Sequence, residues 1–199
     1  MDSKLQIDVQ KVLLFTGHMI DSEDRKEPRF PKEREAEVRL KIKKSIEIIL
    51  KSKTFTDHFV AIAGGACGGD IIFLELCLEL GIPIKMLLAL PAEKFIAESV
   101  AFAGSSWVDR FYRIYRHVNT EVSIMAETKD LTVSSKENNT NSFWEKNNLW
   151  LLNTAFAYGG NQLTLIAVWD GKGADGPGGT RHMIEEVKDR GAESLVIRL

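Results

Sequence analysis

Short apolar runs that alternate with helical patterns constrain the fold of this chain more than any other feature. The runs span residues 9–16, 59–63, 82–90, 121–126, 163–169 and 194–197. Helical patterns cover residues 31–51, 71–80, 92–102, 107–117, 143–158 and 181–190. Uninterrupted apolar strands that are each followed by a helix are typical of a parallel sheet covered on both faces. We therefore predict an α/β fold with three layers and a mostly parallel sheet, in which residues 1–199 form a single domain.

The loops of such a sheet are the expected place for function. In open α/β sheets, ligands bind outside the carboxyl ends of the strands, where the strand order reverses. The glycine-rich and polar clusters of this sequence all follow predicted strands, so we expect them to meet at that edge. Residues 128–141 are polar and contain few large apolar side chains, and we predict an exposed loop there.

Composition excludes several classes of protein. The net charge of −2 argues against general nucleic-acid binding. The apolar stretches are too short to span a bilayer, the first ten residues are polar, and only two cysteines occur, so we expect a cytoplasmic protein without a membrane partner. The four histidines form no metal-ligand pattern with cysteines or carboxylates, so neither a metal nor a cofactor is expected.

Two glycine-rich loops between a strand and a helix favour an anionic ligand. Backbone N–H groups at the start of a helix suit a phosphate. The first loop contains Gly64, Gly65, Cys67, Gly68, Gly69 and Asp70, and the second contains Trp169, Asp170, Gly171, Gly176, Pro177, Gly178, Gly179 and Thr180. The first loop does not match the dinucleotide fingerprint and carries no Walker lysine. A purely structural turn remains an alternative for the first loop, whose Asp70 we expect to be the N-cap of the next helix.

A third cluster follows the first strand and contains Gly17, His18, Asp21, Arg25, Arg29 and Phe30. The arginines suit a phosphate, although solvated surface arginines would give the same pattern. His18 suits an acid or base, or a structural hydrogen bond. Phe30 and Trp169 are candidates for stacking on a base.

Further candidates lie on the predicted helices. Glu75 is a charged residue on an apolar helix, so we expect it either to act in the site or to be paired. An arginine of the loop after the first strand is the structural alternative. Pro91, Ser99 and Arg110 follow the third strand. They are candidates for ligand contacts, although the helical spacing in this region also suits a row of side chains packed into the core. The adjacent Asn147 and Asn148 are poor mid-helix residues that suit a cap, a packing role or a contact with a base edge or a ribose.

These motifs resemble the SLOG superfamily, which includes the Smf/DprA and lonely-guy proteins. The resemblance covers nearly the whole chain and is carried by the motifs Gly17-His18-Met19-Ile20-Asp21, Arg29-Phe30-Pro31, Cys67-Gly68-Gly69-Asp70, Leu90-Pro91, Phe95, Ser99-Val100, Trp107, Arg110-Phe111, Trp169-Asp170-Gly171 and Gly176-Pro177-Gly178-Gly179-Thr180. It is strongest for bacterial SLOG-like sensor domains attached to tetratricopeptide, TIR or other effector modules. The resemblance implies a Rossmann-like fold and a nucleotide or nucleotide-derived ligand.

Three hypotheses follow. The first is a sensor for a cyclic nucleotide or ADP-ribose-type signal in bacterial antiviral defence, acting on an effector protein or fused module and forming a homodimer. The second is a lonely-guy-type N-glycosidase or phosphoribohydrolase. That signature places Glu three residues after Thr180, where this chain has Met183, so Asp21, Asp70 and Glu75 are the remaining catalytic candidates. The third is an interaction domain without a ligand.

Overall fold

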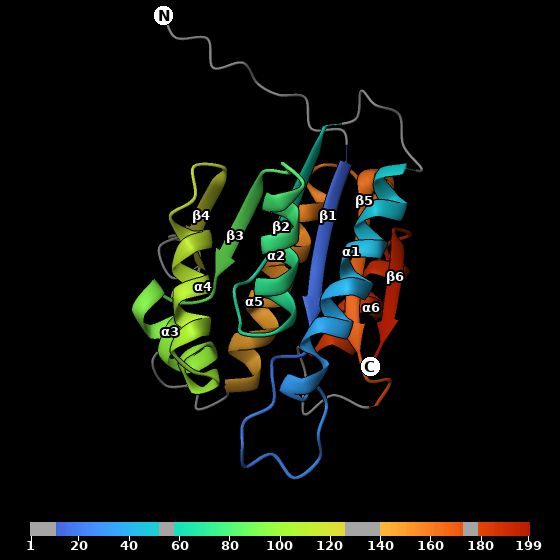
Figure 1. Ribbon diagram of the computed structural model, residues 1–199. Coiled ribbons are helices and arrows are strands. Elements are labelled where there is room, and N and C mark those ends of the chain that lie inside the picture. Colours follow the sequence, from blue (N-terminus) through green and yellow to red (C-terminus); the bar gives the residue numbers. More distant parts are fainter. Residues whose placement is uncertain (1–10, 52–57, 126–139, 173–178) are drawn as a thin grey trace, which may run out of the picture.

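A six-stranded sheet forms the centre of the computed structural model, which describes residues 11–51, 58–125, 140–172 and 179–199 (Figure 1). The strands are β1 (Lys11–Gly17), β2 (Phe59–Ala63), β3 (Ile84–Leu88), β4 (Thr120–Ile124), β5 (Leu163–Trp169) and β6 (Glu193–Arg198). The α-helices are α1 (Glu35–Lys51), α2 (Gly69–Glu79), α3 (Ala92–Ser99), α4 (Ser105–Tyr115), α5 (Thr140–Phe156) and α6 (Thr180–Asp189). Short 3-10 turns η1 (Lys32–Arg34), η2 (Ala101–Ala103) and η4 (Gly160–Gln162) complete the described elements.

The strand order is β4-β3-β2-β1-β5-β6, and every neighbouring pair is parallel. The chain builds outward from β1 to β4, and then crosses back to place β5 on the other side of β1. The order therefore reverses between β1 and β5, which pair from Val12–Leu163 to Gly17–Val168. This Rossmann-like arrangement confirms the predicted α/β fold class, and it puts the edge favoured for ligands at the ends of these two strands.

Two helical layers cover the sheet because successive residues of a strand face opposite sides. Leu13 and Phe15 of β1 lie in the core cluster that contains residues of α1, α2 and α4, where Phe15 stacks on Phe73 with ring centroids 4.8 Å apart. Val12 and Leu14 lie in a second cluster with residues of α5 and α6. Figure 1 shows α1, α2 and α4 in front of the sheet and α5 and α6 behind it. Both faces are thus sealed.

The predicted elements are confirmed within the described residues, which leave out residues 9, 10 and 126 of the predicted strands, and four details are corrected. The first helix, predicted from residue 31, begins as η1, and α1 starts only at Glu35. Helix α5 begins at Thr140, so the predicted exposed loop is wrong for its last two residues, and residues 128–139 lie outside the described ranges. The helix predicted to reach residue 102 ends at Ser99 and continues as η2. Asp70 is not an N-cap, because α2 begins at Gly69 and its N-cap is Gly68. No helix among the described residues is long and apolar enough to cross a bilayer.

Candidate ligand-binding site

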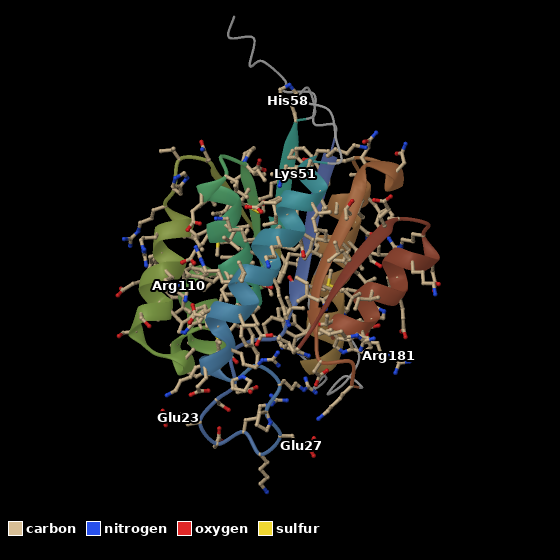
Figure 2. The ribbon with its side chains drawn as sticks, turned by 45° about the vertical axis from the view of Figure 1, so that its right-hand side comes forward. Glu23, Glu27, Lys51, His58, Arg110 and Arg181 are labelled. Atoms are coloured by element: carbon tan, nitrogen blue, oxygen red, sulfur yellow. The ribbon has the colours of Figure 1, made fainter. Side chains whose placement is uncertain are left out.

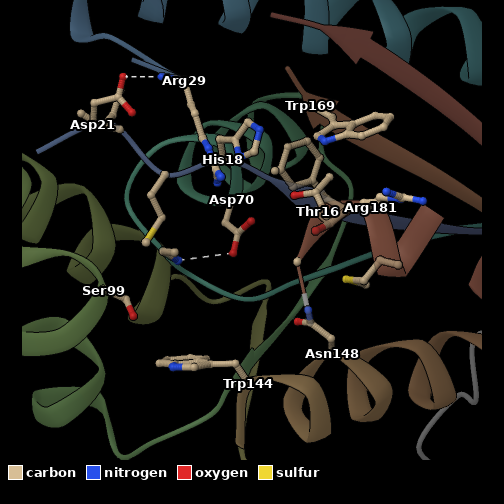
Figure 3. A pocket seen from close by; sticks show the side chains of 18 of the residues that line it. Thr16, His18, Asp21, Arg29, Asp70, Ser99, Trp144, Asn148, Trp169 and Arg181 are labelled. Carbon is tan, nitrogen blue, oxygen red and sulfur yellow. Dashed lines mark hydrogen bonds between the residues drawn. The ribbon is translucent and has the colours of Figure 1, made fainter. Parts of the chain in front are cut away.

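A cavity of about 600 Å³ lies at the carboxyl ends of β1 and β5, where the strand order reverses (Figure 3). It is walled by the loop after β1, the start of α2, α3 with η2, α5, the end of β5 and the start of α6. Several predicted site residues line it: Gly17, His18, Asp21, Arg25, Arg29, Asp70, Ser99, Trp169, Gly179 and Thr180. Its volume lies in the range of pockets that hold small ligands and cofactors.

The loops after β1 and β2 bind each other directly. Met19 and Gly68 form an isolated antiparallel bridge, the N–H of Gly69 donates to the carbonyl of His18 at 3.1 Å, and the N–H of Ile20 donates to Cys67 at 3.2 Å. Gly68 has a φ of 102°, and a Cβ there would lie 2.6 Å from the backbone nitrogen of Ile20. Glycine is therefore required at this crossing. Gly179 borders the same cavity as Asp70, whereas Gly176, Pro177 and Gly178 lie outside the described residues.

The first glycine-rich loop uses several of its N–H groups for hydrogen bonds within the protein. The N–H of Cys67 donates to Ser99 O at 2.9 Å, and the N–H of Ala66 reaches Asp70 Oδ2 at 3.4 Å. Gly65 packs so closely that a Cβ would lie 2.4 Å from Met86 Cε. Of this loop, only Ala66 and Asp70 line the cavity. Gly64, Gly65, Gly68 and Gly69 do not line the cavity, so their expected role as a phosphate cradle stays a prediction.

Asp70 places a carboxyl group in the middle of the cavity (Figure 3). The residue belongs to the first turn of α2, and its carboxyl accepts from the backbone N–H groups of Ala66 and Gly65. Burial penalises the charged form more than these two bonds favour it, so the pKa of Asp70 is raised to about 7. A carboxyl group with this pKa exchanges a proton near neutral pH and is suited to hydrogen-bonding a ligand.

His18 joins the end of β1 to the end of β5. Its Nε2 accepts from the backbone N–H of Asp170 at 3.2 Å and lies 3.2 Å from Asp170 Oδ1. Burial lowers the pKa of His18, although the Asp170 carboxylate acts in the opposite direction. A neutral imidazole that carries its proton on Nδ1 satisfies the N–H of Asp170. His18 therefore has a positioning role in the structure.

Asp21 holds the loop after β1, which carries Arg25 and Arg29, through hydrogen bonds. Its Oδ2 accepts from the N–H of Arg29 at 2.9 Å, and its own N–H donates to the carbonyl of Phe30 at 2.9 Å. Arg25 Nε lies 3.4 Å from Asp21 Oδ1, and Arg29 Nε lies 3.9 Å from Asp170 Oδ2. The two carboxylates hold both guanidinium groups at the rim of the cavity. Figure 2 shows Glu23 and Glu27 of the same loop at the end of the molecule where Arg181 lies.

Aromatic side chains line the side of the cavity formed by α3, η2 and α5. Phe95, Phe102 and Trp144 border the cavity, and Met19 and Phe102 are large apolar residues that remain exposed there. Asn148 lies beside Trp144 on α5 (Figure 3). Thr16, Trp144, Arg181 and Met183 were not predicted as site residues. The unfavourable mid-helix asparagines were the only sequence signal for the contribution of α5.

Glu75 and Arg110 form an ion-pair cluster away from this cavity. Arg110 Nε and Nη2 each donate to the Glu75 carboxylate at 2.8 Å, and Arg39 Nη1 donates to Glu75 Oε2 at 2.8 Å. The Arg110 guanidinium also stacks 3.9 Å from the centroid of Trp107. Glu75 is therefore paired, by α4 and α1 rather than by the loop after β1. Figure 2 shows Arg110 over α4, apart from Arg181 at the rim.

Other predicted site residues also lie outside the cavity lining. Phe30 is fully buried in the core and cannot stack on a ligand. Pro91 is the exposed N-cap of α3, and Gly171 lies beside Arg198 with a φ of 82°. The Asp170 carboxylate lies beside His18 and Arg29, both of which line the cavity. Burial raises the pKa of the Cys67 thiol to about 12, so it does not act as a nucleophile. Within the described ranges, no group of histidine, cysteine and acidic residues could hold a metal ion.

The start of α6 closes the last wall of the cavity. Gly179 is the N-cap of this helix, and Thr180 is its buried first residue. Met183, at the position where the lonely-guy signature places glutamate, is also buried and lines the cavity. This wall is therefore apolar at the point where a hydrolase of that type needs a carboxylate. Arg181 is exposed and pairs with Glu185, with Nε and Oε1 2.7 Å apart.

The chain has a structural match among solved proteins, but its sequence gives none. No protein-family model matches the chain, and a search of curated proteins finds no relative. Among solved structures, DNA processing protein A (DprA) from Streptococcus pneumoniae matches with a TM-score of 0.40 and 12% sequence identity. The match covers 95% of this chain and 59% of the DprA chain, so the present chain spans about three fifths of that protein's length.

Proposed function

We propose that this chain binds a nucleotide or a nucleotide-derived signal in the cavity between β1 and β5. The observation that carries the proposal is the division of one cavity into a cationic side and an aromatic side. Arg25, Arg29 and Arg181 come from the loop after β1 and the start of α6, whereas Phe95 and Trp144 come from α3 and α5. Figure 3 shows Arg29 and Arg181 opposite Trp144, with a second aromatic residue, Trp169, beside Arg181. A nucleotide presents phosphate at one end and a flat base at the other, and guanidinium groups and aromatic rings bind these two parts.

The start of α6 strengthens the cationic side. A helix N-terminus carries a partial positive charge and unsatisfied N–H groups. Gly179 and Thr180 bring this end to the cavity beside Arg181. The motif resemblance to the SLOG superfamily supports the same class of ligand. The same resemblance also supports the proposal that the chain is a member of that superfamily.

The resemblance also supports a sensor rather than a catalyst. In this proposal the bound nucleotide is a signal in bacterial defence, and the domain acts on an effector protein or a fused module, as a homodimer. Light scattering of the protein with and without a bound nucleotide tests the dimer. A mass that corresponds to one chain under both conditions would contradict it.

Nucleotide hydrolysis by an N-glycosidase mechanism is the second candidate, and the carboxyl group of Asp70 inside the cavity favours it. An oxocarbenium-like transition state needs an ionised carboxylate. The pKa of about 7 leaves Asp70 only partly ionised at neutral pH, and Met183 supplies no alternative. Chromatography of each nucleotide after incubation separates the two candidates: the sensor returns the nucleotide intact, whereas the hydrolase releases free base.

Calorimetric titration tests the proposed binding directly. The ligands are AMP, GMP, CMP, UMP, 3′,5′-cyclic AMP and ADP-ribose, with the matching nucleosides and inorganic phosphate as partial ligands. We expect at least one nucleotide to bind at a ratio of one per chain and more tightly than its nucleoside. Arg29→Gln should weaken it about tenfold, because a charge-assisted contact to phosphate is lost. Arg113→Gln, an exposed arginine on α4 outside the cavity, is the matched control. Binding to none of these nucleotides would refute the proposal.

A further inference from the structure

The order of the groups along the cavity suggests which part of a nucleotide each one meets. Figure 3 shows Arg29 on one side of Asp70 and Trp144 on the other. Both line the same cavity as Asp70. A phosphate at the arginines and a base against Trp144 leave the sugar at Asp70, because the ribose joins these two parts of a nucleotide.

The ionised form of Asp70 makes this place unfavourable for a phosphate. A phosphate beside the ionised carboxyl of Asp70 would put two anions in contact in a half-buried place, which is unfavourable. Asp21 also lines the cavity, but its Oδ2 is occupied by the N–H of Arg29 and its Oδ1 faces Arg25. Asp70 accepts from two backbone N–H groups, and a carboxylate has about four acceptor positions, so it retains capacity for a ligand.

A hydroxyl group complements Asp70 better than an amino group does. Because burial raises the pKa of Asp70 to about 7, its carboxyl is present both as an acceptor and as a donor near neutral pH. A hydroxyl both donates and accepts, so it matches either form, whereas an exocyclic amine of a base only donates. The adjacent ribose hydroxyls are the groups of a nucleotide that have this property at this place.

Resting on the proposed nucleotide binding, we propose that Asp70 selects the sugar by hydrogen-bonding the 2′- and 3′-hydroxyls of a ribose held between the arginine rim and Trp144. The site then prefers ribonucleotides to deoxyribonucleotides. Because a C–H group cannot hydrogen-bond to the carboxyl of Asp70, loss of a hydroxyl leaves this carboxyl with its two backbone N–H partners alone and without the ligand's hydrogen bond. Sites built for a hydroxyl discriminate strongly against ligands that lack it.

Paired calorimetric titrations of the wild-type protein test this inference without any variant. The probes are AMP, GMP, CMP and UMP, each beside its 2′-deoxy and 3′-deoxy form, at pH 7. We expect each deoxy form to bind at least tenfold more weakly than its ribonucleotide. Equal binding of ribo and deoxy forms overturns the role of Asp70 and leaves the proposed nucleotide binding intact. An affinity that instead follows the amino groups of the bases assigns Asp70 to the base and also overturns the inference. Binding of none of these probes overturns both proposals.

Two variants locate the selectivity. Asp70→Ala should bring the ratio between ribo and deoxy forms close to one, since the partner of the hydroxyls is gone. Asp109→Asn changes an exposed aspartate of α4 outside this cavity and should keep the wild-type ratio. An unchanged ratio in a folded Asp70→Ala protein, checked by circular dichroism, contradicts the assignment.

Discussion

The stability of the Asp70→Asn variant should depend on pH differently from that of the wild-type protein. The pKa of Asp70 is about 7 in the folded chain, against 3.8 for an unperturbed aspartate, because burial penalises the carboxylate. The folded state therefore keeps this proton where the unfolded state has lost it. The stabilising contribution of the protonated form is complete below pH 3.8 and is lost as the pH rises through about 7. Asparagine has nearly the same shape and does not titrate.

The magnitude follows from the two pKa values. The linkage relation, at 1.36 kcal/mol for each pKa unit, gives a wild-type loss of about 2.5 kcal/mol between pH 5 and pH 8 from this group alone. This is an upper value, because the carboxylate borders the cavity and water there solvates it. Urea unfolding at pH 5, 6, 7 and 8 measures both proteins. The free energy of unfolding of Asp70→Asn minus that of wild type should grow steadily over this range. A constant difference, or one that shrinks with pH, would refute the assigned environment of Asp70.

Three further predictions concern residues that position the site. Gly68→Ala should lower the free energy of unfolding by at least about 2 kcal/mol in urea titrations, because the new Cβ meets backbone at 2.6 Å at a φ of 102°; a neutral effect would contradict the tight crossing of the two loops. Arg110→Met should cost about 2–3 kcal/mol of stability, since it leaves the half-buried Glu75 without its bidentate partner, and should leave nucleotide affinity unchanged because neither residue lines the cavity. Reduced affinity in that variant would show that the cluster and the cavity are coupled. His18 should titrate below pH 6.5 in NMR spectra of its ring protons, and a higher pKa would show that the Asp170 carboxylate outweighs burial.

The layers of the fold could be predicted from the sequence because burial on both faces leaves a direct trace. Strand β1 is apolar at consecutive positions, and α1 repeats Val38, Ile42, Ile46 and Ile49 at helical spacing, all of which are buried. The end of the sheet that carries the cavity followed from the same pattern, since loops at the carboxyl ends of parallel strands share one edge. The strand order did not follow, because no residue pattern states which strands are neighbours.

The glycine-rich loop after β2 shows why the roles within the site were harder to predict. Four glycines near a helix start are typical of a phosphate cradle, but here Gly65 gives space to Met86, and Gly68 gives space to the loop after β1. Close packing and a close ligand leave the same sequence signal. Glu75 posed the same problem, because a paired carboxylate and a catalytic one are both rare on a buried helix. Their partners are fixed only by tertiary structure.

The cavity wall formed by α5 left almost no trace in the sequence. An aromatic residue such as Trp144 on a helix is usually a core residue, and only the neighbouring asparagines were unusual there. Asn148 borders the cavity, whereas Asn147 is buried. Which of two adjacent polar residues faces a ligand depends on the rotation of the helix, and a helix with apolar residues on most sides does not define that rotation.

Indole N–H signals in NMR spectra test the central claim most directly, because the chain has four tryptophans and Trp144 and Trp169 line the cavity whereas Trp107 and Trp150 do not. The spectra are recorded during titration with AMP, 3′,5′-cyclic AMP and ADP-ribose. Binding between β1 and β5 predicts saturable shifts of the Trp144 and Trp169 signals, with those of Trp107 and Trp150 unchanged. Shifts confined to Trp107, or no saturable shift with any of these nucleotides, would contradict a nucleotide site at this place.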